Sequence, residues 1–227
     1  MSELISLPSL KSSIDIKKLD EYSLDFLKLE LKDFSVINKI STFHEARQKE
    51  FLLGRYSSKI NFNHNFHYEL RDLNIGEHRE PVWPNGFIGS LSHSRTYVVS
   101  ALAKNDSIEY LGIDIEYIGR VGTGVAQKIL IDKDVTNADG LTTDQVLTLI
   151  FSAKEAFYKA LFPKYGRFFG FESAYISNIS FSNKSFNLSL SVDLDEYFTM
   201  ERFNNIEGKF IIYDSHIITL IEIPSLD

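Results

Sequence analysis

Seven apolar runs of strand length and two long helical patterns divide this chain, and their order limits the folds open to it. Three runs rich in Ile, Val, Leu and Tyr occupy residues 86–92, 96–104 and 109–117. Four more follow nearer the C-terminus, at 175–181, 186–192, 209–213 and 217–223. Short apolar runs bounded by turn residues predict strands, and strands that follow one another directly predict antiparallel sheets. The order therefore favours an α+β fold.

Two possible capping boxes predict where the long helices begin. The pairs are Thr42 with Glu45 and Thr142 with Gln145. The first predicts a helix over 43–58, and the second a helix whose apolar residues keep a 3.6-residue spacing until Pro163 marks its end. Residues 61–86 collect His, Asn, Gly and Pro and are predicted to form a loop, whereas 24–34 fit either a strand or a helix.

The elements fall into two halves of similar content. A turn at Asn105-Asp106 suggests a boundary that separates an N-terminal half, 1–106, from a C-terminal half, 107–227. Each half is expected to hold a long helix and about three strands. We therefore predict two similar, pseudo-symmetric halves, each a small antiparallel sheet packed with a long helix.

Composition narrows the class of protein. The 227 residues include no Cys, which excludes disulfides, thiolate metal sites and a Cys nucleophile. A net charge of −7 gives no basic field for nucleic acid or an anionic membrane. No apolar run approaches the ~18 residues of a membrane span, and the N-terminus lacks a signal-peptide pattern. We expect a cytoplasmic protein.

Two acidic residues share one face of a predicted strand. Because side chains alternate along a strand, Asp114 and Glu116 in Gly-Ile-Asp-Ile-Glu lie on the same face, about 7 Å apart. A divalent cation would relieve their repulsion, and oxygen ligands suit Mg²⁺. The alternative is a solvent-facing strand that carries ordinary acids.

A third carboxylate lies on the second predicted helix. Glu155 and Lys159 are one turn apart, on a stripe with Thr148 and Ser152 that lies opposite the apolar stripe. The two charged residues either point into one cleft or pair with each other on the surface. Lys154 points about 100° away from Glu155 and need not share its role.

Polar and basic groups of the N-terminal half could hold an anion. Ser92 and His93 end a predicted strand, where side chains and exposed N–H groups can bind phosphate, although a plain turn is the alternative. The first helix carries Arg47 and Arg55, which either bind an anion or form a solvated basic face. Its Gly54 costs up to ~1 kcal/mol against Ala, which suggests close packing at that point.

The order and spacing of these motifs resemble the 4′-phosphopantetheinyl transferases, in particular the branch that includes enterobactin synthase component D. The series is R-x-x-E-F-L-x-G-R, R-x-P-x-W-P-x-G-x-x-G-S-x-S-H-S, G-I-D-I-E and F-S-x-K-E-A-x-x-K-A-L, followed by Y-G-R-F-F-G-F. The resemblance covers roughly residues 41–172. It implies two similar α+β halves with the active site at their junction.

The resemblance also implies a reaction and its cofactor. Such enzymes move the 4′-phosphopantetheine arm of coenzyme A to a serine of a carrier protein and release adenosine 3′,5′-bisphosphate. One Mg²⁺ would be held by Asp114, Glu116 and Glu155. Glu155 would also act as the catalytic base, and Lys159 would contact the phosphates and assist the leaving group. Coenzyme A would be bound by Lys159 and by six residues of the N-terminal half: Arg47, Arg55, Arg79, Pro81, Ser92 and His93.

The implied partners are coenzyme A and acyl, peptidyl or aryl carrier protein domains of siderophore or other non-ribosomal peptide biosynthesis. We expect a monomer that binds no nucleic acid. Two other functions use the same residues differently. A Mg²⁺-dependent phosphohydrolase would direct water at a nucleotide pyrophosphate, and a non-catalytic module would only bind the carrier protein.

Two segments are candidates for carrier docking. Residues 118–125 contain three glycines and are expected to form a mobile loop at the mouth of the site, with Val121 and Val125 as docking contacts. Residues 164–171 carry three phenylalanines, which either dock the carrier or lie buried against the second sheet.

Overall fold

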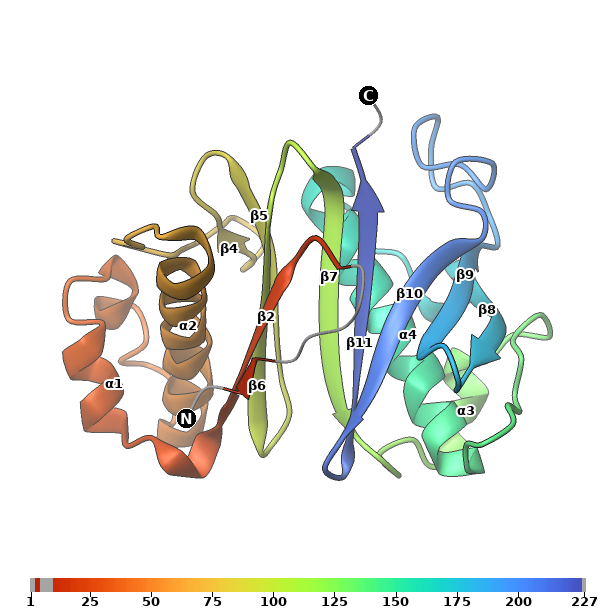
Figure 1. The fold of residues 1–227 in the computed structure, drawn as a ribbon, viewed down its shortest axis with the longest axis horizontal. Helices are drawn as coiled ribbons and strands as arrows, with labels where there is room; N and C mark the ends of the chain where they lie inside the picture. The colour runs from red at the N-terminus through yellow and green to blue at the C-terminus, as the bar shows by residue number, and fades with distance from the viewer. Residues whose placement is uncertain (1–2, 5–9, 226–227) are drawn as a thin grey trace. The chain divides into compact units, whose positions relative to one another are not determined.

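Figure 1 shows the computed structural model, which describes residues 3–4 and 10–225. The chain forms two compact units. The first contains the described residues up to Leu111 together with Pro224 and Ser225, and the second is Gly112–Ile223. The division falls inside strand β7 (Ile108–Tyr117), a little beyond the boundary expected from the sequence. Each unit is an antiparallel sheet with a long helix, which confirms the predicted α+β class.

The sheet of the first unit has the order β1-β2-β6-β5. Its strands are β1 (Glu3–Leu4), β2 (Ser13–Lys18), β5 (Phe87–His93) and β6 (Tyr97–Lys104). All neighbours are antiparallel, with β2 and β6 in register from Ser13↔Leu102 to Lys18↔Tyr97. The two strands predicted in this unit are confirmed, but β1 and β2 were missed. A separate hairpin pairs β3 (Asn74–Ile75) with β4 (Pro81–Val82).

Helix α2 (Glu45–Phe66) is longer than predicted and begins differently. The side chain of His44 caps it, with Nδ1 accepting from Arg47 N at 3.3 Å, so the capping role predicted for Thr42 is wrong. The helix runs on through 61–66 because Asn61 and Phe62 are buried there. The predicted loop over 61–86 is therefore wrong for its first turn and a half.

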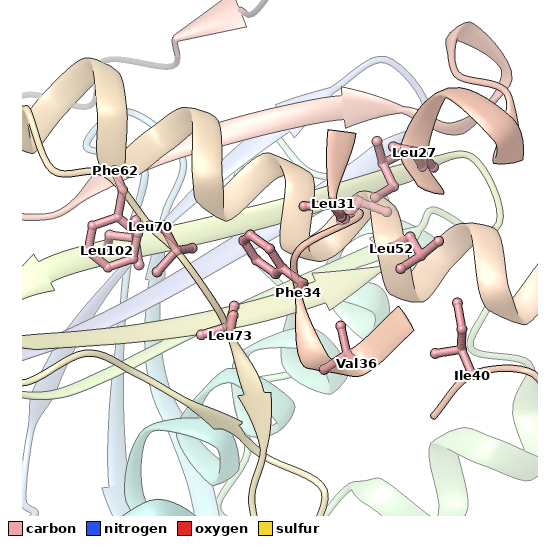
Figure 2. Close-up of a cluster of buried hydrophobic side chains, with 12 residues drawn as sticks. Leu27, Leu31, Phe34, Val36, Ile40, Leu52, Phe62, Leu70, Leu73 and Leu102 are labelled. Atoms are coloured by element: carbon pink, nitrogen blue, oxygen red, sulfur yellow. The ribbon is translucent and has the colours of Figure 1, made fainter. Parts of the chain in front are cut away.

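Helix α1 (Leu24–Glu30) settles the open choice for 24–34 as a helix. Leu27, Leu31 and Phe34 join buried residues of α2 in one cluster, shown in Figure 2. Short 3₁₀ turns lie on either side of α1, at Leu19–Glu21 and Ser35–Asn38. A Cβ added at Gly54 would lie 3.6 Å from Leu91 Cδ1, which is ordinary contact, so the close packing expected there is absent at this described position.

The sheet of the second unit has the order β7-β11-β10-β9-β8. The strands besides β7 are β8 (Ala174–Ser180), β9 (Ser185–Leu190), β10 (Ile206–Tyr213) and β11 (His216–Pro224). Pairs β8–β9, β9–β10 and β10–β11 are antiparallel. All five predicted strands of this half are confirmed, so the half holds more than the three expected. The turn at Asp214, with φ 51°, joins the last hairpin as predicted.

Three helical segments belong to this unit: α3 (Thr123–Ile129), α4 (Thr143–Tyr165) and a 3₁₀ turn at Phe171–Ser173. The predicted capping box of α4 is confirmed, because Thr142 Oγ1 accepts from Gln145 N and Gln145 Oε1 accepts from Thr142 N. The predicted end at Pro163 is wrong. Proline disrupts a helix chiefly through the turn before it, and α4 continues until Gly166 adopts φ 71°.

Strand β7 and helix α4 approach each other closely at Gly112. A Cβ at this position would lie 1.9 Å from the carbonyl oxygen of Ala156 and 2.8 Å from the nitrogen of Ala160. Only glycine fits against a helix backbone at that distance. The contact brings the face of β7 that carries Gly112, and two residues later Asp114, against α4.

Candidate active site

Asp114 faces helix α4 from strand β7. Only 3% of the residue is exposed, and its Oδ1 accepts a hydrogen bond from Lys159 Nζ at 2.7 Å. Alternation along the strand places Asp114 on the same side as Gly112, which contacts α4 directly. The alternative of a solvent-facing acidic strand is therefore wrong at Asp114.

Glu116 lies two residues farther along β7 and is mostly buried. Burial, followed by repulsion from Asp114, raises the pKa of Glu116 to about 7. Arg120 opposes this shift, because its Nε lies 3.0 Å from Glu116 Oε2. The carboxyl group of Glu116 is thus near its titration point at neutral pH.

Glu155 reaches the same region from α4. Burial raises its pKa first and the negative charge of Asp114 adds to the effect, whereas Lys159 lowers it. Since Glu155 also raises the pKa of Glu116, the three carboxylates act on one another electrostatically. The structure thus brings together Asp114, Glu116, Glu155 and Lys159. The alternative in which Lys159 only pairs with Glu155 on the surface is wrong, because Lys159 is also hydrogen-bonded to the buried Asp114.

The chemistry of these donors fits a hard divalent cation, since all three are carboxylates that repel one another. As placed, however, the side chains of the described residues contain no group of three His, Cys, Asp or Glu arranged to hold a metal. Two of the three acids contact cationic side chains instead, Asp114 with Lys159 and Glu116 with Arg120. A cation would have to compete with these ion pairs for carboxylate oxygens.

The polar stripe of α4 is anchored to the rest of its unit. Ser152 Oγ lies 2.8 Å from Thr219 Oγ1 on β11, and Thr148 Oγ1 accepts from Gly119 N at 3.3 Å. Both side chains are fully buried. These bonds fix the rotation of the helix about its axis, and with it the direction in which Glu155 and Lys159 point.

Lys154 points elsewhere, as the helical spacing predicted. Its Nζ is buried and donates at 2.7 Å both to Asp134 Oδ2 and to the carbonyl of Ile129. Asp134 in turn accepts from Ile131 N and Ile176 N. Sequence reasoning missed Asp134 because no motif marks it, and only its distant partner on α4 reveals the pair.

A cavity of about 190 Å³ opens beside Glu155. Its walls are largely aromatic and come from α4 and the segment after it: Lys154, Glu155, Tyr158, Phe168, Phe169, Gly170, Phe171 and Ala174. The sequence predicted that the phenylalanines of this segment either dock the carrier or lie buried against the second sheet, and it did not predict a cavity. The segment's density of phenylalanines was the available signal for an apolar wall.

In the first unit, Arg47 of α2 meets His93 at the end of β5. Arg47 Nη1 lies 2.5 Å from His93 Nε2 and donates to Glu50 at 3.2 Å. His93 is part-exposed, whereas Ser92 is buried on the other face of β5, as alternation requires. Arg47 and His93 are therefore brought together, two turns of helix before Arg55.

Arg55 is a buried cation. The residue is 5% exposed, and burial followed by repulsion from Arg47 lowers its pKa to about 9. Its guanidinium carbon lies 3.5 Å from the ring centroid of Phe51, while Nε has no hydrogen-bond partner among the described residues. A buried donor without an acceptor is costly, so this position favours an anionic ligand.

Arg79 and Pro81 lie in and after the turn of the β3–β4 hairpin. Arg79 is exposed and adopts φ 71°, and Pro81 begins β4. Among the described residues, no hydrogen bond or ion pair joins either of them to Arg55.

The docking segments differ from expectation. Residues 123–129 form α3, and Val121 is 3% exposed in a cluster with Ala126 and Ile129. The predicted loop therefore holds for residues 118–122 and is wrong for 123–125, which begin a helix. Burial of Val121 contradicts its predicted role as a docking contact, whereas Val125 is 37% exposed. Among the phenylalanines after α4, Phe169 is buried but Phe168 is 81% exposed. Burial therefore holds for Phe169 and not for Phe168, and the role of the segment in carrier docking stays a prediction.

Two family profiles match the chain and together span most of it. The 4′-phosphopantetheinyl transferase superfamily matches residues 110–220, and the 4′-phosphopantetheinyl transferase N-terminal domain matches 38–103. The chain belongs to this superfamily. It is an enzyme that transfers 4′-phosphopantetheine to carrier proteins.

Three characterised relatives illustrate the similarity. The transferase Npt of Nocardia iowensis is 27% identical over 225 residues, covering 93% of this chain and 96% of the relative. Enterobactin synthase component D of Salmonella typhimurium is 30% identical over 81% of this chain and 75% of its own length. PptT of Mycobacterium tuberculosis is 33% identical over 58% of each chain. Among the residues described, no helix is long and apolar enough to cross a membrane.

Proposed function

We propose that this transferase modifies acyl, peptidyl or aryl carrier protein domains that serve siderophore or other non-ribosomal peptide biosynthesis. Several relatives are enterobactin synthase component D proteins, which supports the pathway. The observation that carries the assignment of the site is the cluster of three interacting carboxylates beside Lys159. Among the described residues, no contact favours a water-directed phosphohydrolase over this reaction.

Asp114, Glu116 and Glu155 would hold one Mg²⁺. When bound, the ion would neutralise charge on the pyrophosphate of coenzyme A. The residues of the chain would do the remaining work. Glu155 would accept the proton of the carrier serine hydroxyl, and its raised pKa suits a base that operates near neutral pH.

The serine oxygen then attacks the phosphorus nearest pantetheine. The new O–P bond forms as the bond from that phosphorus to the bridging oxygen breaks, and adenosine 3′,5′-bisphosphate leaves with that oxygen. Lys159 would stabilise the negative charge on the leaving group. With three N–H donors, its ammonium group can hold Asp114 and a phosphate oxygen together.

The N-terminal half, 1–106, would bind the nucleotide of coenzyme A, and the C-terminal half, 107–227, would supply the metal ligands and the catalytic helix. Arg55 is the leading candidate for the 3′-phosphate, because it is buried and its Nε is unpaired among the described residues. Arg47, Ser92 and His93 would hold other phosphate oxygens. Arg79 and Pro81 would contact the nucleotide from the β3–β4 hairpin, a role that rests on the resemblance alone.

We further propose a cytoplasmic, monomeric enzyme, in line with a chain that contains no cysteine. The location of the active site at the junction of the halves stays a prediction.

Competition between carriers tests the pathway. The enzyme is incubated with coenzyme A, Mg²⁺ and equal amounts of two apo-carriers, one from a non-ribosomal peptide synthetase and one from fatty-acid synthesis. Intact-mass spectrometry should show the phosphopantetheine mass gain first on the synthetase carrier. Faster modification of the fatty-acid carrier would overturn the pathway assignment. Cleavage of coenzyme A without a mass gain on either carrier would instead indicate hydrolysis.

A further inference from the structure

Arg120 lies in the segment 118–125, for which only a docking role was predicted, yet its side chain lies in the acidic cluster. Its Nε is 3.0 Å from Glu116 Oε2. Its guanidinium carbon also lies 5.5 Å from the ring centroid of Phe151, which precedes Glu155 by one turn of α4. The cation therefore sits between one proposed metal ligand and an aromatic ring one turn from another.

The backbone after β7 builds this arrangement. Arg120 N donates to Tyr117 O at 3.0 Å, which closes a tight turn directly after the strand. Gly119 within the turn has φ 89°, a conformation that suits glycine, and its N–H donates to Thr148 on α4. Ile118 N is bonded to Ser215 O at 2.9 Å. Three hydrogen bonds donated by backbone N–H groups thus fix the turn that returns Arg120 towards Glu116.

The partners of Arg120 differ in exposure. The side chain of Glu116 is 16% exposed, whereas that of Arg120 is 54% exposed. The carboxylate is therefore fixed in the protein, while the guanidinium reaches it from solvent and can withdraw there. The carboxylate of Glu116 can therefore exchange the guanidinium of Arg120 for another positive partner.

We propose that Arg120 is an internal counter-cation of the metal site, which competes with the divalent ion for Glu116 and thereby weakens its binding. The inference rests on the proposed function, because it takes Glu116 as a metal ligand. A guanidinium and a divalent ion that share one carboxylate repel each other, so binding of the ion requires Arg120 to move away. Arg120 thus sets the concentration of Mg²⁺ at which the site fills.

Replacement of Arg120 by a neutral residue should tighten cation binding. We expect R120Q to lower the dissociation constant for Mn²⁺, used as a probe for the Mg²⁺ site, by roughly three- to tenfold, the range of a partly exposed charge pair. Binding is measured on the full chain, with coenzyme A but without a carrier, by electron paramagnetic resonance of free Mn²⁺. No turnover is needed for this measurement.

Two matched variants control for general effects. Arg167 also pairs with an acid, Asp195 at 3.2 Å, and lies 5.0 Å from the ring centroid of Tyr165, but it contacts none of the proposed ligands. R167Q removes the same charge from the same unit and should leave the Mn²⁺ dissociation constant within twofold of wild type. R120K keeps the charge and should also remain close to wild type.

The outcomes separate the two proposals. Tighter binding by R120Q alone supports the counter-cation role. Unchanged or weaker binding by R120Q, with wild-type binding intact and abolished by D114N, overturns that role and leaves the metal assignment standing. Absence of Mn²⁺ binding by the wild type, or its persistence in D114N, overturns the metal assignment and the inference together.

Discussion

Lys159 Nζ donates to Asp114 Oδ1 at 2.7 Å, and this bond joins the middle of helix α4 to the strand that carries the acidic motif. Asp114 is almost fully buried, whereas about a quarter of the Lys159 side chain is exposed. A buried carboxylate needs a partner to remain ionised. Lys159 therefore has a structural effect on Asp114 in addition to the role that we propose for it in catalysis.

A double-mutant cycle measures this relationship. K159M leaves the carboxylate of Asp114 buried beside an apolar side chain. Introduced into the wild type, it should therefore lower the free energy of unfolding by more than the same change does when it is introduced into D114N. A coupling of about 1–3 kcal/mol is expected for groups in direct contact. Urea denaturation at pH 7 gives the four values. Strict additivity would show that the contact contributes nothing to stability.

The same variant tests catalysis. K159M should reduce kcat for carrier modification by at least about 100-fold, since a charge-assisted contact to the leaving group is lost. K164M, which removes a lysine from an exposed position of the same helix, is the matched control and should keep kcat within about twofold of wild type. Equal losses in the two variants would argue against a specific role for Lys159.

Gly112→Ala should be strongly destabilising. The new methyl group would meet the backbone of α4, 1.9 Å from Ala156 O, and the strand would have to move away from the helix. We expect a loss of at least about 2 kcal/mol in the free energy of unfolding, as for an overpacked core. Gly124→Ala is the control, because nothing lies within 4 Å of its added Cβ and Ala favours helix α3. Similar stabilities of the two variants would contradict the close approach.

The raised pKa of Glu116 predicts a pH dependence of stability. Between its ordinary value of 4.5 and about 7, the folded protein keeps a proton that the unfolded chain has released. The folded state therefore binds more protons, and the contribution of Glu116 to the free energy of unfolding falls as pH rises through this window. The side chain of E116Q cannot titrate, so the variant does not lose stability at this position as pH rises.

The test is urea denaturation of both proteins at pH 5 and pH 7.5 in a metal chelator. The stability of E116Q relative to wild type should increase between these pH values. If the two proteins change in parallel with pH, the carboxyl group of Glu116 titrates at its ordinary value and the account of its burial is wrong.

Arg55→Ala should raise the KM for coenzyme A by roughly 10- to 100-fold, because charge-assisted hydrogen bonds to the 3′-phosphate are lost. Dephospho-coenzyme A, which lacks this phosphate, should show almost the same KM with both enzymes. Arg71→Ala removes an exposed arginine from the same unit and should change neither value. An equal increase with both donors would assign Arg55 to another part of the nucleotide or to the fold.

Local patterns in the sequence predicted much of the fold. The capping box at Thr142 and the strand runs of the second half depend on neighbours in the chain, and the structure confirms them. Some local features were predicted wrongly, and features that depend on distant contacts were missed. His44 replaces Thr42 as a cap, and Val121 is buried because α3 forms against it. The need for glycine at position 112 arises only from the backbone of α4, more than forty residues away.

The candidate site shows the same division. Spacing indicated that Asp114 and Glu116 share a face and that Lys154 points away from Glu155. The partners of these residues, Arg120 and Asp134, have no motif that marks them. Arg120 lies only four residues after Glu116, but the turn that brings the two side chains together has no sequence signal of its own. Lys154 and Asp134 lie 20 residues apart, and their pairing becomes visible only when the fold is known.

The most direct test of the account is the rate of carrier modification by Glu155→Gln, followed by intact-mass spectrometry with coenzyme A and saturating Mg²⁺. We expect a loss of at least about 100-fold, since the variant lacks the proposed base. Glu201→Gln, at an exposed acid of the same unit, should retain the wild-type rate. Transfer by the Glu155 variant within about threefold of wild type would contradict the central claim that carboxylates of β7 and α4 drive the reaction.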